Sequence, residues 1–173
     1  MPSPVGHLLG GAIVGLLVEP AAVLVIAIAG AAPDVDFLWG RHNAETHSLG
    51  AAVLTGAVVL GWARWANLKV CPHPYRLALA VTLAWSSHVL FDWLGSDDTP
   101  PLGVMALWPL NSTYYFAHAY FFEAISRRYW LSNFWSHNLY AVAKEVLILG
   151  PVLVALRVFR SRALRRFRRR DTT

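Results

Sequence analysis

Four long apolar runs constrain the fold of this chain more than any other feature. They lie at Leu8–Ala32, Leu49–Ala66, Leu77–Leu94 and Leu139–Phe159. A bilayer core of about 30 Å takes roughly 20 helical residues, so each run is long enough, or nearly so, to form a membrane helix. Composition agrees, because 56% of the 173 residues are apolar and 14% are charged, whereas soluble domains average about 45–50% and about 25%. We therefore predict an all-α, polytopic helical membrane protein.

The first run is interrupted by Glu19 and Pro20. Proline removes a helical hydrogen bond and disfavours helix at the residue before it, which predicts two halves, Leu8–Val18 and Ala21–Ala32. These halves form either a re-entrant or kinked N-terminal helical hairpin, or a single kinked span. A signal peptide is disfavoured because no Lys or Arg precedes the run. Farther along, the aromatic-rich segment Tyr114–Ile125 is typical of an interfacial helix.

The net charge of +5 comes from the C-terminal end. Residues 157–173 hold eight arginines and one acid, whereas residues 1–156 hold seven basic and nine acidic side chains, a net of −2. This predicts a helical membrane domain over 1–156 and a basic cytoplasmic tail over 157–173 that contacts anionic membrane lipid, with no nucleic-acid partner. With the connection that holds Arg64 and Arg76 also placed in the cytoplasm, Pro33–Thr46 and Gly95–Asn138 lie on the outer face of the plasma (inner) membrane.

Histidine and aspartate side chains stand out against this apolar background. His88 and Asp92 are four residues apart in an apolar run and so share one helix face. An ionisable pair inside a membrane segment is costly and indicates function, although a structural polar pair is the alternative. If the N-terminal hairpin forms, further groups reach the same outer interface. The predicted metal ligands are His7, Asp34, Asp36, His42, His47, His88 and Asp92, and Asp36 and His42 are also predicted catalytic groups.

Imidazole and carboxylate ligands suit Zn²⁺, with Mn²⁺ or iron as alternatives, and the set is large enough for one or two divalent ions. Such a site can lower the pKa of a bound water and support hydrolysis. The sequence contains no Gly-rich phosphate loop and no Gly-x-Ser-x-Gly motif, and it has a single cysteine, Cys71. Part of the segment His42–Ser48 has a second interpretation, because Thr46 or Ser48 can cap the next helix.

A set of ordered motifs resembles a known family. These are Gly6-His7-Leu8-Leu9, Pro33-Asp34-Val35-Asp36, His42 followed by Thr46-His47-Ser48, Ser87-His88 with Asp92, and Thr99-Pro100 with Leu107-Trp108-Pro109. Together they are similar to the YdjM-type family of LexA-regulated, membrane-bound metal-dependent hydrolases. The resemblance implies a small helical inner-membrane protein whose metal ligands are the His and Asp residues named above. A more distant similarity to all-helical zinc-dependent phospholipases and nucleases implies a phosphoester substrate.

The sequence thus predicts a membrane-bound metal-dependent hydrolase that uses metal-activated water on a phosphoester of a lipid or lipid-linked substrate. Two alternatives stay open. One is an ion or proton transporter that relays cations through His88 and Asp92. The other is a membrane protein that binds metal without catalysis.

Overall fold

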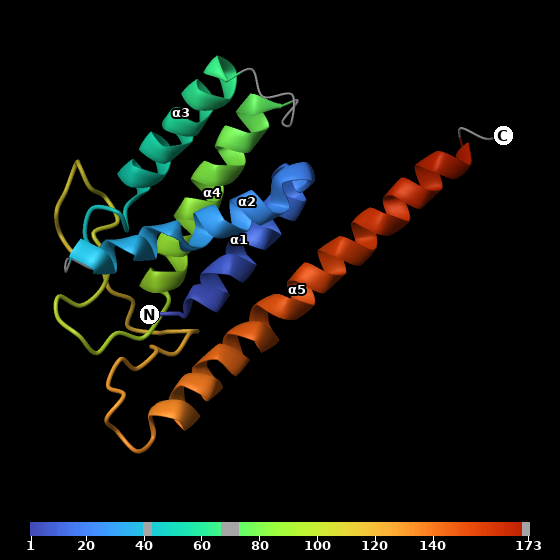
Figure 1. The fold of residues 1–173 in the computed structure, drawn as a ribbon. Coiled ribbons are helices and arrows are strands. Elements are labelled where there is room, and N and C mark those ends of the chain that lie inside the picture. Colours follow the sequence, from blue (N-terminus) through green and yellow to red (C-terminus); the bar gives the residue numbers. More distant parts are fainter. Residues whose placement is uncertain (40–42, 67–72, 171–173) are drawn as a thin grey trace.

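The computed structural model describes residues 1–39, 43–66 and 73–170, and these residues form helices joined by irregular segments. The elements are α1 (Pro4–Val18), η1 (Pro20–Ala22), α2 (Val23–Ala31), η2 (Ala32–Trp39), α3 (Leu49–Trp65), α4 (Pro74–Trp93) and α5 (Phe134–Arg170). Figure 1 shows α3 and α4 side by side, α2 crossing α4, and α5 extending away from the other helices. Helix α1 packs against α2 and α4. No strand occurs in the described part of the chain, so the predicted all-α class is confirmed.

The first apolar run folds back on itself at Glu19 and Pro20, so α1 and α2 pack as an antiparallel hairpin. Glycines allow their backbones to touch. A Cβ atom on Gly11 would lie 2.7 Å from the Ile26 carbonyl oxygen, and one on Gly30 would lie 2.7 Å from the carbonyl oxygen of His7. The hairpin places the start of α1 beside the end of α2. Its re-entrant placement in a bilayer remains a prediction.

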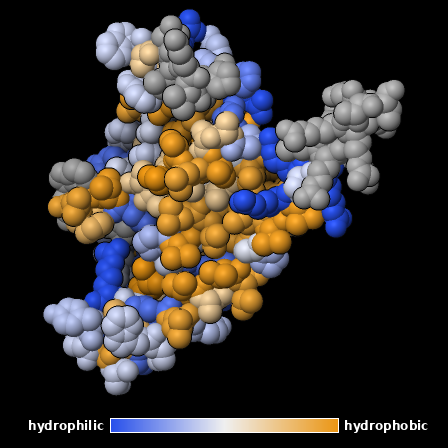
Figure 2. Space-filling view, turned by 45° about the vertical axis from the view of Figure 1, so that its right-hand side comes forward, coloured by the Kyte–Doolittle hydropathy of each residue, from blue (hydrophilic) through white to orange (hydrophobic). Residues whose placement is uncertain are grey.

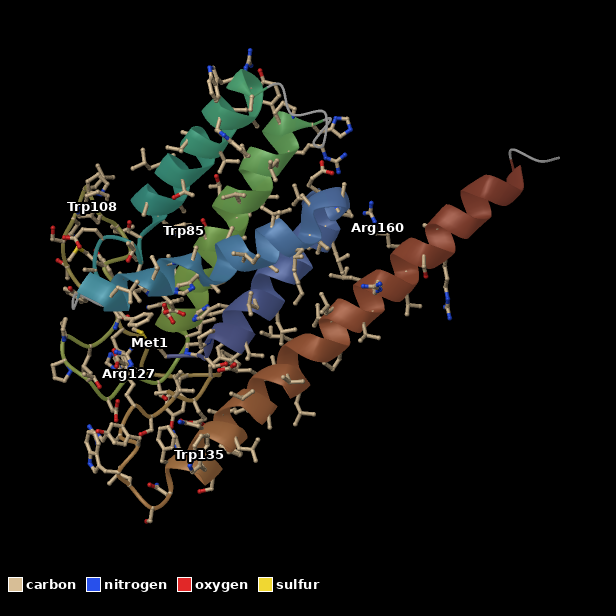
Figure 3. The ribbon with its side chains drawn as sticks, viewed as in Figure 1. Met1, Trp85, Trp108, Arg127, Trp135 and Arg160 are labelled. Atoms are coloured by element: carbon tan, nitrogen blue, oxygen red, sulfur yellow. The ribbon has the colours of Figure 1, made fainter. Side chains whose placement is uncertain are left out.

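Two arginines satisfy backbone carbonyls at the turn of this hairpin. The last four carbonyls of a helix lack intrahelical partners. Nε of Arg76 donates to the Val18 carbonyl at 3.0 Å and lies 3.6 Å from Oε2 of the buried Glu19 side chain. Nη1 of Arg160 donates to the Leu16 carbonyl at 3.2 Å, and Figure 3 shows Arg160 beside this turn. The pairing with Arg76 explains how an acidic residue is accommodated inside an apolar run.

The remaining helices pack around the hairpin. Ile26 of α2 joins Leu77, Ala80, Val81 and Ala84 of α4 in a buried apolar cluster. Helix α5 contacts α1, and it continues to Arg170, so the basic tail predicted from residue 157 begins as a helix.

The outer surface carries many large apolar side chains. Figure 2 shows a broad apolar band across the middle of one face, with hydrophilic residues gathered towards the ends. By length and composition, two helical segments of the described chain are able to cross a membrane, namely Pro20–Leu38 and Phe134–Ala163. Helices α1 and α3, with 15 and 17 residues, are shorter apolar helices. An apolar surface of this extent favours a lipid environment.

The interfacial helix predicted at Tyr114–Ile125 is wrong. This segment is irregular, and its backbone groups bond to another part of the chain instead of along a helix. Tyr115 and Val104 exchange two backbone hydrogen bonds of 2.8 and 3.0 Å, and Ser96 N donates to the Phe122 carbonyl at 2.9 Å. These pairings with residues 95–104 occupy backbone groups that a helix would have used, and composition alone carried no signal for them.

Candidate metal centre

Four separate elements bring polar side chains to one end of the bundle. His7 lies on the first turns of α1, Asp34 and Asp36 on η2, His47 in the segment before α3, and His88 and Asp92 on the last turns of α4. Local sequence sets these positions. Helix α4 continues past Val89 to Trp93, so His88 and Asp92 share one face as predicted. The side chain of Ser48 caps α3 by accepting from Ala51 N at 3.0 Å, which resolves the capping alternative and leaves Thr46 for the site.

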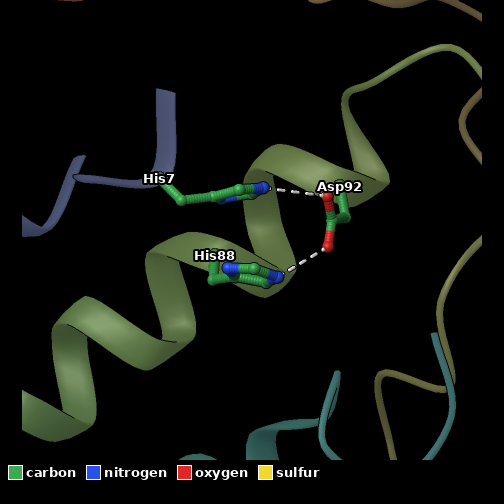
Figure 4. Close-up of side chains that lie close together, drawn as sticks. All are labelled: His7, His88 and Asp92. Atoms are coloured by element: carbon green, nitrogen blue, oxygen red, sulfur yellow. Dashed lines mark ion pairs between the residues drawn. The ribbon is translucent and has the colours of Figure 1, made fainter. Parts of the chain in front are cut away.

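Asp92 is at the centre of the cluster. Its Oδ1 lies 3.3 Å from Nε2 of His7, and its Oδ2 lies 3.0 Å from Nε2 of His88 and 3.4 Å from Nε2 of His47. Figure 4 shows His7 and His88 side by side with their Nε2 atoms directed at the Asp92 carboxylate. The two rings are stacked with centroids 3.6 Å apart. One carboxylate therefore faces three imidazoles.

Asp34 approaches the same group of nitrogens from η2. Its Oδ1 lies 3.6 Å from Nε2 of His47 and 3.7 Å from Nε2 of His88. The ligand atoms form two overlapping groups, His7, His88 and Asp92, and Asp34, His47 and His88, with all atoms of a group within 4.8 Å of one another. Because His88 belongs to both groups, the five residues make one continuous cluster.

Outer contacts hold two of the three imidazoles in place. Nδ1 of His88 lies 2.8 Å from the Gly30 carbonyl, which can only accept, so Nδ1 carries a proton and Nε2 is the nitrogen directed at the cluster. Nδ1 of His47 lies 3.1 Å from Oδ2 of Asp36, to which the Thr46 hydroxyl also donates at 2.6 Å. Carboxylate or carbonyl contacts to the outer nitrogen are typical of metal-binding histidines.

The segment that carries His47 is fixed by neighbours on either side. Nε1 of Trp85 donates to the Thr46 carbonyl at 2.7 Å, and Leu49 N donates to the Ala106 carbonyl at 2.9 Å. Figure 3 labels Trp85 close to this end of the bundle. Residues 104–109 pack tightly over the start of α3, since a Cβ on Gly50 would lie 2.2 Å from the Trp108 carbonyl oxygen. Thus two of the motifs singled out in the sequence pack together.

The burial of the donor atoms fits a bound cation. The side chains of His7, His47, His88 and Asp92 are 0–1% exposed. Among the described residues, Nε2 of His7, Nε2 of His88 and both carboxylate oxygens of Asp92 are buried without a hydrogen bond of good geometry. Buried polar groups are normally satisfied, and imidazole with carboxylate is a donor set that suits Zn²⁺, Mn²⁺ or Fe²⁺. A divalent cation is the kind of group that these residues are arranged to bind.

The electrostatics of His47 point the same way. Burial by itself lowers the pKa of this imidazole, but the hydrogen bonds to Asp34 and Asp36 outweigh burial and raise the pKa to about 9. Without a metal ion, His47 therefore holds an extra proton at neutral pH. Its environment favours positive charge, which a bound cation would supply in place of that proton.

The structure brings together five of the seven predicted ligands, namely His7, Asp34, His47, His88 and Asp92. It places Asp36 at the outer nitrogen of His47, and His42 lies outside the described residues. Outside the cluster, Asp97 accepts hydrogen bonds from Thr99 N and Gly103 N and so shapes a turn. Glu123 pairs with Lys144 at 2.8 Å.

Sequence reasoning missed Glu145. This residue is fully buried on α5, and its carboxylate accepts hydrogen bonds from the backbone and side chain of Ser3, next to the turn that carries His7. A signal was present, because an acidic residue inside the apolar run Leu139–Phe159 is costly unless it has a partner.

The fold and the cluster define an all-helical protein with an extensive apolar surface and a candidate metal centre at one end of its bundle. The YdjM inner membrane protein family matches residues 1–165, and the chain belongs to that family. No curated protein and no solved structure matches it significantly. The family description gives a location and no activity, so it confirms the predicted family and an inner-membrane protein.

Proposed function

We propose that this protein is a membrane-bound, metal-dependent hydrolase that cleaves a phosphoester of a lipid or lipid-linked substrate. The observation that carries the proposal is the buried cluster of three imidazoles and two carboxylates, which gathers around Asp92 from four separate elements. Residues so costly to bury are kept for binding or chemistry. Regulation by LexA, which the family resemblance implies, is part of the same proposal.

In this proposal the chain's own residues hold and orient the centre. His7, His47, His88, Asp34 and Asp92 would hold one or two divalent ions, with Zn²⁺ the first choice. Asp36 and the Gly30 carbonyl keep the outer nitrogens of His47 and His88 occupied, which fixes the direction of their inner nitrogens. When bound, such an ion polarises a phosphoester and supplies an activated water near neutral pH. Asp36 is then a positioning residue, and His42 stays a predicted catalytic group.

The exposure of the ligands supports a substrate that approaches from one side. The Asp34 side chain is 22% exposed, whereas those of His47, His88 and Asp92 are 0–1% exposed. Asp34 lies on η2, whose Phe37 and Leu38 are 59% and 65% exposed. The open side of the cluster is thus bordered by apolar surface, which suits a substrate with a lipid portion.

The charges support one orientation for this proposed multi-pass protein. Arg64, Arg76 and Arg160 lie on the ends of α3, α4 and α5 that are opposite the cluster. Lys and Arg favour the cytoplasmic side. We therefore place the C-terminal tail in the cytoplasm and the metal centre at the outer face of the inner membrane.

The position of the proposed ligands and two further experiments distinguish the hydrolase from a transporter and from a non-catalytic metal-binding protein. A transporter needs polar groups along a path through the bilayer, whereas the five proposed ligands meet at one end of the bundle. Cation flux into proteoliposomes without hydrolysis would favour transport. Stoichiometric metal with no turnover on any lipid would favour the non-catalytic alternative.

The test uses the purified full chain in detergent with Zn²⁺. Metal content is measured by elemental analysis, and phosphate or head-group release from mixed phospholipid micelles is followed by ³¹P NMR. We expect His88→Ala to lose both metal and turnover, and His118→Ala, the same change at a histidine outside the cluster, to keep both. Full metal content after His88→Ala combined with Asp92→Ala would refute the site. Metal binding that depends on these residues, with no turnover, would refute the hydrolase alone.

A further inference from the structure

Glu145 is the most deeply buried acidic residue of the described chain outside the metal centre. It lies on the apolar helix α5, and its side chain is directed at the N-terminal end of α1. Ser3 N donates to Oε1 of Glu145 at 2.6 Å, and the Ser3 hydroxyl donates to Oε2. One carboxylate thus accepts two hydrogen bonds from a single residue that is 142 positions away.

Ser3 in turn holds the first turn of α1. It is the N-cap residue, and its Oγ accepts from Val5 N at 3.2 Å and from Gly6 N at 3.3 Å. Gly6 leaves room for the Glu145 carboxylate, since a Cβ at this position would lie 2.8 Å from Oε2 of Glu145. Glu145, Ser3 and Gly6 therefore form one packed contact between α5 and the turn that precedes His7.

His7 needs such support more than the other two imidazoles do. His47 and His88 each have an outer nitrogen held by Asp36 or by the Gly30 carbonyl. By contrast, neither ring nitrogen of His7 has a hydrogen bond of good geometry among the described residues. Its ring is held by stacking on His88, and its backbone N donates to the Ser3 carbonyl at 3.3 Å. The direction of His7 therefore depends on where the first turn of α1 is fixed.

We infer that Glu145 is a positioning residue for the metal centre, which acts through Ser3 and the first turn of α1 to aim His7 at the bound ion. This role replaces the outer hydrogen bond that none of the described residues gives to His7. The inference rests on the proposed function only for the presence of a metal ion, and it does not require that the protein be an enzyme.

The test measures Zn²⁺ affinity of the full chain in detergent by competition with a chromophoric chelator. Loss of a residue that orients a metal ligand typically weakens metal binding about 10–100-fold. We expect a loss in that range for Glu145→Ala and a smaller loss for Glu145→Gln, which keeps one acceptor for Ser3. Lys144→Gln is the matched control. It breaks the contact of α5 with Glu123 and leaves the contact with Ser3 in place, so its affinity should equal that of the wild type.

Double variants separate positioning from general stability. At Zn²⁺ concentrations that still load a His7→Ala variant, Glu145→Ala should weaken Zn²⁺ binding no further in that background. In an Asp36→Asn background, which keeps all five proposed ligands, Glu145→Ala should have its full effect. If Glu145→Ala does not fold, Glu145→Gln and Ser3→Ala take its place in the same cycles. Unchanged affinity in the folded Glu145 variants, an equal loss in Lys144→Gln, or full additivity with His7→Ala would overturn the inference and leave the proposed metal centre intact. Absence of Zn²⁺ binding by the wild type would overturn both.

Discussion

Removing the metal should lower the thermal stability of this protein. Replacing Asp92 should remove most of the stabilisation that the metal gives. The proposed ligands come from α1, η2, the segment before α3, and α4, so a bound ion joins four segments that separate on unfolding. At a free metal concentration of 100 times Kd, a ligand that binds only the folded state stabilises it by about 2.7 kcal/mol. For a chain of this size, each kcal/mol corresponds to about 2–4 °C in Tm. Chelation should therefore lower Tm by roughly 5–11 °C.

Asp92→Asn removes the charge that faces His7, His47 and His88 at 3.0–3.4 Å. If Kd rises about 100-fold, the same metal concentration equals Kd and the stabilisation falls to about 0.4 kcal/mol. The assay is thermal unfolding in detergent, followed by tryptophan fluorescence, with Zn²⁺ or with chelator. Asp98→Asn is the control, because that side chain is 68% exposed. A Tm difference between metal and chelator that is the same in wild type and Asp92→Asn would refute the assignment.

Three further predictions test other parts of the structure. In chelator, the folded protein holds a proton on His47 up to the pKa of about 9, whereas the unfolded chain releases it near pH 6.5. The free energy of unfolding should therefore be highest below about pH 6.5 and should fall as the pH rises through about 9. Thermal unfolding measured from pH 6 to 10 should depend less on pH in His47→Gln than in the wild type. Gly30→Ala should destabilise the folded protein by about 1–3 kcal/mol, because its Cβ would lie 2.7 Å from the His7 carbonyl oxygen. A Cβ on Gly61 of α3 would have nothing within 4 Å, so Gly61→Ala should stabilise the folded protein by about 0.5–1 kcal/mol. Equal Tm values for the two variants would contradict the close packing at Gly30. For the proposed orientation, Asp98→Cys in a Cys71→Ser background should react with a membrane-impermeant maleimide added outside intact cells, and labelling only after lysis would reverse the topology.

The helices could largely be predicted from the sequence. Leu49–Ala66 was expected and α3 is Leu49–Trp65, and the break at Pro20 separates α1 from α2 as the missing amide requires. The segment Tyr114–Ile125 was mispredicted because its aromatic composition suits several conformations. The conformation of this segment depends on backbone hydrogen bonds with residues 95–104, which are distant in sequence.

The residues of the candidate site were likewise predictable from the sequence only in part. His88 and Asp92 were predictable, because a spacing of four residues on a helix dictates that they share a face. The roles of Asp36 and Thr46 at the outer nitrogen of His47 depended on side-chain directions in an irregular segment, which no periodicity encodes. Glu145 was missed for a related reason, since its partner Ser3 is 142 residues away.

By itself, the sequence determined the class of this protein, because apolar runs of this length have few stable solutions other than helices, and it determined which residue types were available as ligands. The tertiary structure decided that the first apolar run folds back on itself, so that His7 and Asp34 both reach His47, His88 and Asp92 at one end of the bundle. The physical reason is that composition and periodicity act over a few residues, whereas a metal centre depends on distances between atoms of four separate segments. Those distances are set by glycine contacts such as Gly11 against Ile26 and Gly30 against His7, where the absence of a side chain lets two backbones meet.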